Sequence, residues 1–337
     1  MSKVKKPVIA KLSDLRPGDH ADCFVQLAEK TRGTTRDGNP FYTCKFRDAM
    51  KTVGAVPIWS DSPLFASAED WQSGQFFKVR VTYTENEKYG PQLAVEQIRP
   101  VEDRDRADGF SELDFVERSR FNPDEMLSEL EGLAGVEIAD VPLRTLTVNL
   151  LKAHATALKV LPASTRHAYP FAGGWLEHTL AVTRTALWLS DRYAARFPEL
   201  IPPLNRSLVV ASAILHDIGR VRGVDAPPGQ PGKPSVAGEL FGPLVLGYDL
   251  IRDAAKSVPD LNPELLELLL HCVVAHQKGE RGANPPAIPE ALILHHADAL
   301  DSSFEMYARC LTRDNSEGPF TDRDAVLNRQ LLKARKV

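Results

Sequence analysis

The apolar side chains of this 337-residue chain change their spacing once, and this change limits the folds that the chain can adopt. Residues 10–101 contain short runs of alternating apolar and polar side chains separated by turn residues, which is typical of strands. From Asn122 to about residue 312 the spacing is helical throughout, with no strand pattern of comparable strength. The length suits two domains. The sequence therefore predicts a multidomain protein in which a small β-barrel precedes an all-α region.

Charge and capping residues subdivide the chain further. Residues 102–140 carry 13 acidic residues against four arginines and no lysine, so residues 102–120 are predicted to be an acidic linker and not a nucleic-acid surface. Asn122 and Pro123 have the character of an N-cap and a first helical residue. The helical domain is predicted over residues 121–312, with a polar tail over 313–337. Its helices are predicted over 142–160, 174–197, 204–219, 238–256, 263–277 and 288–311.

The net charge of −4 excludes a uniformly basic nucleic-acid-binding protein, but the charge is unevenly distributed. Residues 1–100 hold 15 basic and 12 acidic residues, a net of +3, which leaves −7 for the rest of the chain. The barrel is therefore the part that suits a polyanion. Because +3 is a small excess, we do not expect the barrel alone to bind tightly without regard to sequence.

One face of the predicted barrel combines aromatic and basic side chains, which single-stranded nucleic acid requires for base stacking and phosphate contacts. In the run that follows the Asp37-Gly38-Asn39-Pro40 turn, Tyr42 and Cys44 alternate inward while their neighbours face outward. A second alternating run covers residues 76–83. Trp59 and Phe76 are secondary candidates for this face, although for Trp59 a place in the barrel core is the preferred prediction. The candidate nucleic-acid-binding residues are Phe41, Lys45, Arg47, Lys78 and Arg80.

The cysteines and the apolar runs indicate a soluble, cytoplasmic protein. Four cysteines without CxxC spacing are typical of buried structural thiols in a reducing compartment. The basic N-terminus is followed by no apolar stretch of a signal peptide, and no run approaches 18 uninterrupted apolar residues. We therefore expect no membrane partner.

Eight of the nine histidines lie in the helical region, and several stand beside acidic residues. A lone histidine on a helix is more often a hydrogen-bonded structural residue than a metal ligand. The His216-Asp217 doublet differs, because burying both groups at the end of so apolar a helix is costly unless a cation pairs with them. With His178 and Asp298, the doublet would form a mixed nitrogen and oxygen site suited to Mn, Fe, Mg or Zn.

The order of these four residues resembles the signature of the HD-domain metal phosphohydrolases, an all-helical fold. The surrounding segments resemble the YhaM-type 3′-5′ exoribonucleases, which place an OB-fold ahead of an HD domain. The resemblance covers residues 10 to 312 approximately, including Asp37-Gly38-Asn39-Pro40-Phe41 in the barrel. The segments that carry it in the helical region are His167-Ala168-Tyr169, Gly173-Gly174-Trp175-Leu176-Glu177-His178-Thr179, Ile214-Leu215-His216-Asp217-Ile218-Gly219, Gly238-Glu239-Leu240 and His295-His296-Ala297-Asp298-Ala299-Leu300-Asp301.

The resemblance implies roles for individual residues. The implied metal ligands are His178, His216, Asp217 and Asp298. The expected catalytic residues are Asp217, Arg220, His276 and Lys278, of which Arg220 and Lys278 are alternatively ordinary surface charges. The residues expected to support the ligands are His167, His271, His295 and Asp301.

The chain also departs from the family pattern at positions associated with a second metal. Pro243 follows Gly242 where the family has a histidine, and Gln277 replaces one member of a His-His pair. Because proline cannot ligate a metal, we expect one divalent ion per chain. Mn is the ion expected ahead of Fe, Mg and Zn. Arg220 replaces a lysine and keeps its positive charge with different geometry.

These observations predict a metal-dependent phosphodiester hydrolase that acts on single-stranded RNA. The 3′-5′ polarity comes from the resemblance alone. One alternative is a nucleic-acid-binding or regulatory protein whose HD site has weakened, and another is an HD nucleotide phosphohydrolase. Single-stranded DNA as a second substrate and a homo-oligomer are left open.

Overall fold

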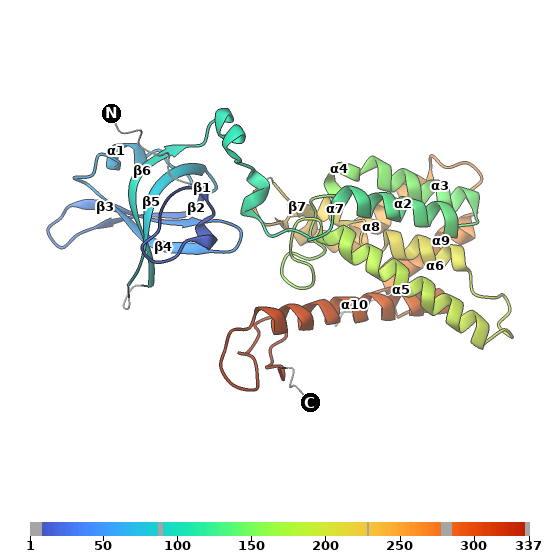
Figure 1. Cartoon of the computed structure of the whole chain (residues 1–337). Helices are drawn as coiled ribbons and strands as arrows, with labels where there is room; N and C mark the ends of the chain where they lie inside the picture. Colours follow the sequence, from blue (N-terminus) through green and yellow to red (C-terminus); the bar gives the residue numbers. More distant parts are fainter. Residues whose placement is uncertain (1–8, 87–89, 228, 278–284, 334–337) are drawn as a thin grey trace. The chain divides into compact units, whose positions relative to one another are not determined.

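The computed structural model describes residues 9–86, 90–227, 229–277 and 285–333, and it divides the chain into two compact units (Figure 1). The main division falls between Glu117 and Arg118. Each unit has its own hydrophobic core, formed by strands in the first unit and by helices in the second. The predicted fold class, a β-barrel followed by an all-α domain, is confirmed.

The first unit is an antiparallel sheet with OB-fold topology. Its strand order is β4-β3-β2-β5-β6, and β1 pairs with β2 in parallel. Strands β4 and β6 also contact each other, which closes the sheet into the five-stranded Greek-key barrel of an OB-fold. The elements are β1 (Ile9–Ala10), a 3-10 turn (Leu12–Asp14), β2 (His20–Thr34), β3 (Pro40–Arg47), β4 (Thr52–Trp59), α1 (Phe65–Ala68), β5 (Phe76–Asn86) and β6 (Gly90–Pro100).

The alternation along the strands separates the barrel core from its surface as predicted, with one exception. Tyr42, Cys44 and Phe46 of β3 are buried, and so are the inward residues of β5 from Phe77 to Tyr83. The expectation that Trp59 lies in the core is wrong, because its side chain is 47% exposed. Trp59 pairs in register with Phe41, and paired residues of neighbouring strands share a face, so Trp59 follows Phe41 outward.

The acidic segment after β6 is folded onto the barrel, where the sequence predicted a linker. It forms two 3-10 turns, Asp103–Asp108 and Glu112–Phe115. Asp105 is buried and accepts two hydrogen bonds from Arg99, at 2.6 and 2.7 Å. The rings of Phe110 and Phe115 pack against Phe76. Opposite charge and apolar contact together explain why this segment belongs to the first unit up to Glu117.

The second unit is a bundle built around α6. Every residue of α6 from Ser207 to Leu215 is buried, because α2, α3, α5, α9 and α10 all contact this helix. The predicted N-cap is confirmed, since the Asn122 side chain accepts from the Asp124 N–H at 2.8 Å. The helices are α2 (Pro123–Glu137), α3 (Val141–Ala153), α4 (Ala155–Leu158), α5 (Gly174–Arg196), α6 (Arg206–Leu215), α7 (Arg220–Gly223), α8 (Val236–Ala255), α9 (Pro263–Ala275) and α10 (Pro289–Arg313), and the two-residue strands are β7 (Val224–Asp225) and β8 (Lys233–Pro234).

The described part of the predicted polar tail folds back after α10. Asp314 accepts a hydrogen bond from Lys333 at 2.5 Å. Thr321, in the segment between these two residues, is buried. Three of the four cysteines are buried as expected, whereas Cys310 near the end of α10 is partly exposed. Among the described helices, none has the length and apolarity needed to span a membrane.

Candidate metal centre

Helix α6 presents the His-Asp doublet at its C-terminal end, in the interior of the bundle. His216 is fully buried and Asp217 is 3% exposed. The Nδ1 of His216 lies 2.7 Å from the carbonyl oxygen of Ala213. A carbonyl can only accept a hydrogen bond, so Nδ1 carries the proton and Nε2 presents a lone pair.

Helices α5 and α10 bring His178 and Asp298 to the same point. The Nε2 of His178 lies 3.3 Å from the Nε2 of His216 and 3.1 Å from Oδ1 of Asp298. On the opposite side of its ring, Nδ1 of His178 donates to Oδ2 of Asp301 at 2.7 Å. A carboxylate that holds the outer nitrogen of a metal-ligating imidazole is a common arrangement in metal sites.

A third imidazole reaches this point from the end of α9. His276 is fully buried, and its Nδ1 donates to the carbonyl oxygen of Val273 at 2.6 Å. Its Nε2 lies 3.8 Å from Oδ1 of Asp217. Neither of these two buried atoms has a hydrogen-bond partner among the described residues. Burying two such polar groups without a partner is unfavourable.

The centre therefore gathers nitrogen and oxygen atoms that can donate electron pairs to one ion. Ligand atoms of His178, His216 and Asp217 lie within 4.8 Å of one another, and Asp298 and His276 approach the same group. Neutral imidazole nitrogens and carboxylate oxygens aimed at one point are the donor set of a divalent transition metal. The residues present fit such an ion.

The electrostatics of the centre follow from burial and from the charged neighbours. Burial lowers the pKa of His216 to about 4. Burial also opposes the charged form of His178, but hydrogen bonds to Asp298 and Asp301 outweigh it and raise the pKa of His178 to about 9. For Asp217, burial disfavours the carboxylate, yet the neighbouring Arg220 guanidinium holds the pKa below its ordinary value.

Among the expected catalytic residues, Arg220 is an internal partner of the doublet. Its Nε donates to Oδ2 of Asp217 at 2.7 Å, and its side chain is only 16% exposed, which does not fit an ordinary surface charge. His276, expected to be catalytic, faces Asp217 and is also a candidate ligand. Its signal in the sequence was the same as that of His216, a histidine at the end of an apolar helix. Lys278 lies outside the described residues.

The four residues expected to support the ligands have different surroundings. Asp301 contacts His178, and Nδ1 of His295 donates to the backbone carbonyl of His276 at 2.6 Å. His271 instead accepts from the backbone N–H of Ala287. The side chain of His167 is exposed, and its backbone is hydrogen-bonded to the side chains of Ser164 and Arg309.

The departure at Pro243 coincides with a break in α8. Gly242 has a φ of +71°, which interrupts the helix directly before the proline. A Cβ on Gly219 would lie 2.1 Å from the carbonyl oxygen of Pro243, so the break is packed onto the turn that follows Asp217. Position 243 therefore lies beside the doublet, where this chain carries a residue that cannot ligate. Gln277 is partly buried next to His276.

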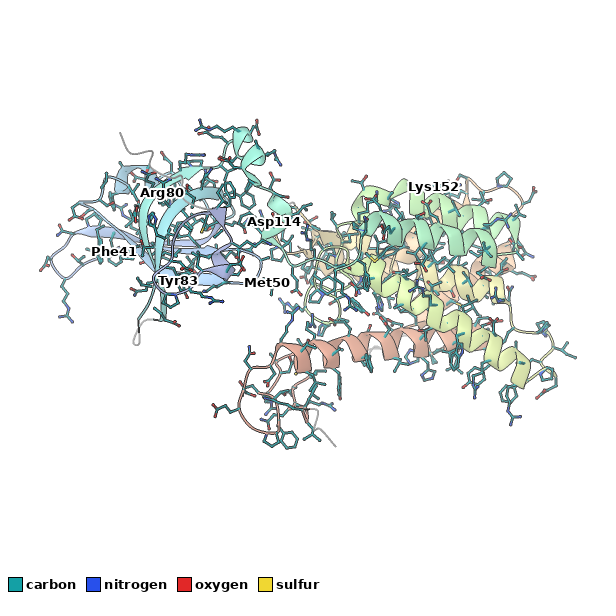
Figure 2. All side chains as sticks on the ribbon, viewed as in Figure 1. Phe41, Met50, Arg80, Tyr83, Asp114 and Lys152 are labelled. Carbon is teal, nitrogen blue, oxygen red and sulfur yellow. The ribbon has the colours of Figure 1, made fainter. Side chains whose placement is uncertain are left out.

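In the barrel, the candidate nucleic-acid-binding residues occupy two different environments. Figure 2 labels one residue from each, Phe41 and Arg80. Lys78 pairs with Asp105 and Asp108 of the acidic segment, and Arg80 makes two hydrogen bonds to Asp22. Arg47 donates to the carbonyl oxygen of Phe115, and burial lowers its pKa.

The other two candidates lie on the exposed face of β3. Lys45 pairs at 2.6 Å with Glu29 while remaining half exposed. The ring of Phe41 lies 5.1 Å from that of Trp59 and also covers Gly33, where a Cβ would approach the Phe41 ring to 2.6 Å. The partly buried Phe41 and the exposed Trp59 thus form an aromatic pair at the barrel surface.

Comparisons with known proteins place these features in a family context. The HD domain family matches residues 175–303. The chain is 28% identical over 318 residues to the 3′-5′ exoribonuclease YhaM of Listeria monocytogenes serotype 4b, covering 93% of this chain and 94% of that protein. The identity to YhaM of Listeria innocua serovar 6a is also 28%, over 315 residues with the same coverage.

Solved structures similar to part of the chain include two structures of a domain of replication protein A from Methanococcus maripaludis. One is a crystal structure with 12% identity and a TM-score of 0.23, and it covers 28% of this chain and 96% of its own. The other is a solution structure of the second OB-fold domain, with 16% identity, a TM-score of 0.22 and the same coverage. Residues 175–303 thus match the HD domain family, and the chain is similar to the YhaM exoribonucleases along nearly its whole length.

Proposed function

We propose that the chain is a metal-dependent phosphodiester hydrolase that degrades single-stranded RNA in the 3′-5′ direction, as the name of its relatives implies. The observation that carries the proposal is the convergence of three imidazole nitrogens and two carboxylates on one buried point. The similarity to the YhaM proteins supports the substrate class and the polarity.

We propose His178, His216, Asp217 and Asp298 as the metal ligands, with His276 as an additional donor. When bound there, a divalent ion supplies Lewis acidity toward water and phosphate oxygens. The chain prepares the site by fixing the tautomer of each imidazole through Asp301, Ala213 and Val273.

Arg220 contributes a fixed positive charge beside the ligands. Its hydrogen bond holds one oxygen of Asp217 and leaves Oδ1 facing the centre. The guanidinium places a positive charge in a largely dry site, where it would stabilise charge that develops on phosphoryl oxygens. We therefore assign Arg220 and Asp217 to the catalytic machinery.

We propose one ion per chain, with Mn ahead of Fe, Mg and Zn. The mixture of imidazole and carboxylate donors suits these metals and does not suit copper or an iron–sulfur cluster. Pro243 and Gln277 occupy the positions at which the family pattern has histidines, which supports a single tightly bound ion.

The barrel is proposed to hold the single strand on the exposed face of β3 and β4. Phe41 and Trp59 offer two ring faces for base stacking, and Lys45 lies on the same face of β3. Lys78 and Arg80 are neutralised by Asp105, Asp108 and Asp22, so their contribution to RNA binding is proposed to be smaller.

A reducing, cytoplasmic location is proposed on the basis of four free cysteines. A homo-oligomer stays a prediction. An exposed apolar stripe of Leu300, Phe304, Tyr307 and Leu311 on α10 has the spacing of a helix-pairing surface and is the first place to test for a second copy.

The decisive experiment incubates the full chain with Mn and 5′-end-labelled single-stranded RNA and follows the product lengths over time. A 3′-5′ exonuclease shortens the labelled strand progressively, and His216→Ala should abolish this shortening. His20→Ala is the matched control, because His20 lies in the barrel and contacts only Glu96 among the partners seen for its ring. Bound metal without RNA cleavage would favour the alternative of a regulatory protein with a weakened site.

A further inference from the structure

Tyr169 adopts a backbone conformation that its residue type disfavours. It lies in the segment before α5, it is 8% exposed, and its φ is +48°. Residues other than glycine rarely have a positive φ, and bulky residues least of all. Such a conformation persists only where the surrounding structure holds it. The strain indicates that the placement of this side chain matters.

Three contacts hold Tyr169 in place. Its backbone N–H donates to Oε2 of Glu305 at 3.1 Å, and its carbonyl oxygen accepts from the N–H of Ala163 at 3.2 Å. A Cβ on Gly174 would lie 2.3 Å from the same carbonyl oxygen, so only glycine permits this approach to the first turn of α5. The position of Tyr169 is thus fixed from α10, from its own loop and from α5.

The side chain of Tyr169 contacts the carboxylate that holds the outer nitrogen of His178. Its hydroxyl donates to Oδ1 of Asp301 at 3.2 Å, while Oδ2 of the same carboxylate accepts from Nδ1 of His178 at 2.7 Å. The ring centroids of Tyr169 and His178 are 5.4 Å apart. Because a carboxylate oxygen can only accept, the hydroxyl is the donor.

One face of α10 supplies the acidic partners in these contacts. Asp298, Asp301 and Glu305 follow one another at spacings of three and four residues, which places them on the same side of the helix. The first contacts Nε2 of His178, the second contacts Nδ1, and the third holds the backbone of Tyr169. The helix therefore links the strained residue to the candidate ligand.

We propose that Tyr169 is a positioning residue for the metal centre and acts through Asp301. Its hydroxyl occupies one oxygen of Asp301 and thereby directs the other oxygen at His178. This fixes the orientation of the imidazole and keeps its Nε2 lone pair aimed at the ligand group. The proposal rests on the proposed metal site, but it concerns affinity for the ion and not turnover of RNA.

The test compares Mn affinity in Tyr169→Phe and in the wild-type chain by isothermal titration with MnCl2. The variant keeps the ring and loses only the hydroxyl, so we expect Mn to bind roughly 10-fold more weakly or worse, the range for lost partners of metal ligands. Thermal unfolding of the metal-free protein should change little. Tyr193→Phe is the matched control, because Tyr193 is an exposed residue of α5 that stacks on Phe197.

A double-mutant cycle with Asp301→Asn separates positioning from a general effect on folding. If Tyr169 acts through Asp301, adding Tyr169→Phe to Asp301→Asn should weaken Mn binding no further. Unchanged affinity in Tyr169→Phe, or losses that add fully in the double variant, would overturn the proposal. If the wild-type chain binds Mn and fails to cleave RNA, the proposed function fails while the affinity data still decide the role of Tyr169.

Discussion

Arg220 Nε lies 2.7 Å from Oδ2 of Asp217, while Oδ1 of the same carboxylate faces Nε2 of His276 without a partner among the described residues. The carboxylate is thus neutralised on one side and open on the other. This asymmetry predicts different consequences for changing the arginine and for changing the aspartate.

Replacing Arg220 by glutamine should reduce turnover more than metal binding. Glutamine can still donate a hydrogen bond to Asp217, but it removes the positive charge from the site. We expect kcat to fall by about 100-fold, the usual effect of losing one electrostatic contact to a transition state. Rates on labelled RNA and Mn titrations measure the two effects separately. Arg222→Gln, on the exposed side of the same short helix, serves as control, and equal losses in both variants would contradict the assignment.

Replacing Asp217 by alanine should remove the bound metal. The variant loses a carboxylate donor and leaves Arg220 without its partner, so elemental analysis after dialysis should find no stoichiometric ion. The rise in Tm that Mn produces in the wild-type chain should disappear as well, because a ligand stabilises only the state that binds it. The exposed Asp225→Ala is the matched control. Wild-type metal content in Asp217→Ala would refute the ligand assignment.

The metal stoichiometry should be one Mn per chain at micromolar concentrations. Pro243 stands beside the turn that follows Asp217 and cannot donate to a second ion. Anomalous scattering from Mn-soaked crystals, or titration with a metal indicator, would count the ions. Two fully occupied positions would show that His276 or another group supports a second ion.

The aromatic pair at the barrel surface should contribute to RNA binding without contributing to stability. Trp59→Ala removes one stacking surface, worth about 1–3 kcal/mol per base, so the Kd for single-stranded RNA should rise by roughly 10- to 100-fold. The Tm should hardly change, because Trp59 is about half exposed. Phe76→Ala gives the contrast: this ring is covered by Phe110 and Phe115, so its loss should lower the Tm. Fluorescence anisotropy with labelled RNA measures the affinity. An unchanged Kd in Trp59→Ala would contradict a role for this aromatic pair in RNA binding.

The stability of the barrel should depend on pH through Asp105. Hydrogen bonds from Arg99 hold the pKa of this buried carboxyl far below its ordinary value, despite the opposing effect of burial. Its stabilising contribution is present above the unfolded-state pKa of about 3.9, and it is lost as the pH falls toward the folded value. Asp105→Asn should therefore lower the Tm at pH 6 and flatten its decline between pH 6 and 3, by thermal melts. The exposed Asp103→Asn should behave like the wild-type chain.

The sequence predicted the features that depend on periodicity. Alternation at Tyr42 and Cys44 and the N-cap at Asn122 appear in the structure because neighbouring residues alone determine them. The four candidate ligands were found through their resemblance to a family, and the structure brings them together. Trp59 was misjudged because its position depends on a distant residue, its partner Phe41 on the neighbouring strand. The catalytic role expected of His276 stays a prediction, and the structure adds Asp217 as its neighbour.

The acidic segment shows the same dependence on a distant partner. From the sequence its charges indicated a solvated linker, whereas Asp105 is buried against Arg99 of β6. The run of acidic residues does not by itself indicate that Asp105 pairs with Arg99. Charge runs of this kind become informative only once the neighbouring strand is known.

The burial of α6 on every side has a consequence for how the site can evolve. Between its termini the helix carries Ala211, Ser212 and Ala213, all fully buried, where larger side chains would push the neighbouring helices away. The His-Asp doublet is attached to the end of this segment, so any displacement of the helix is transmitted to the ligands as a change in their separation. Inherited substitutions in these three small residues can therefore silence the metal centre while every ligand remains intact. Surveys of variants that inspect only the ligands would miss this class of loss.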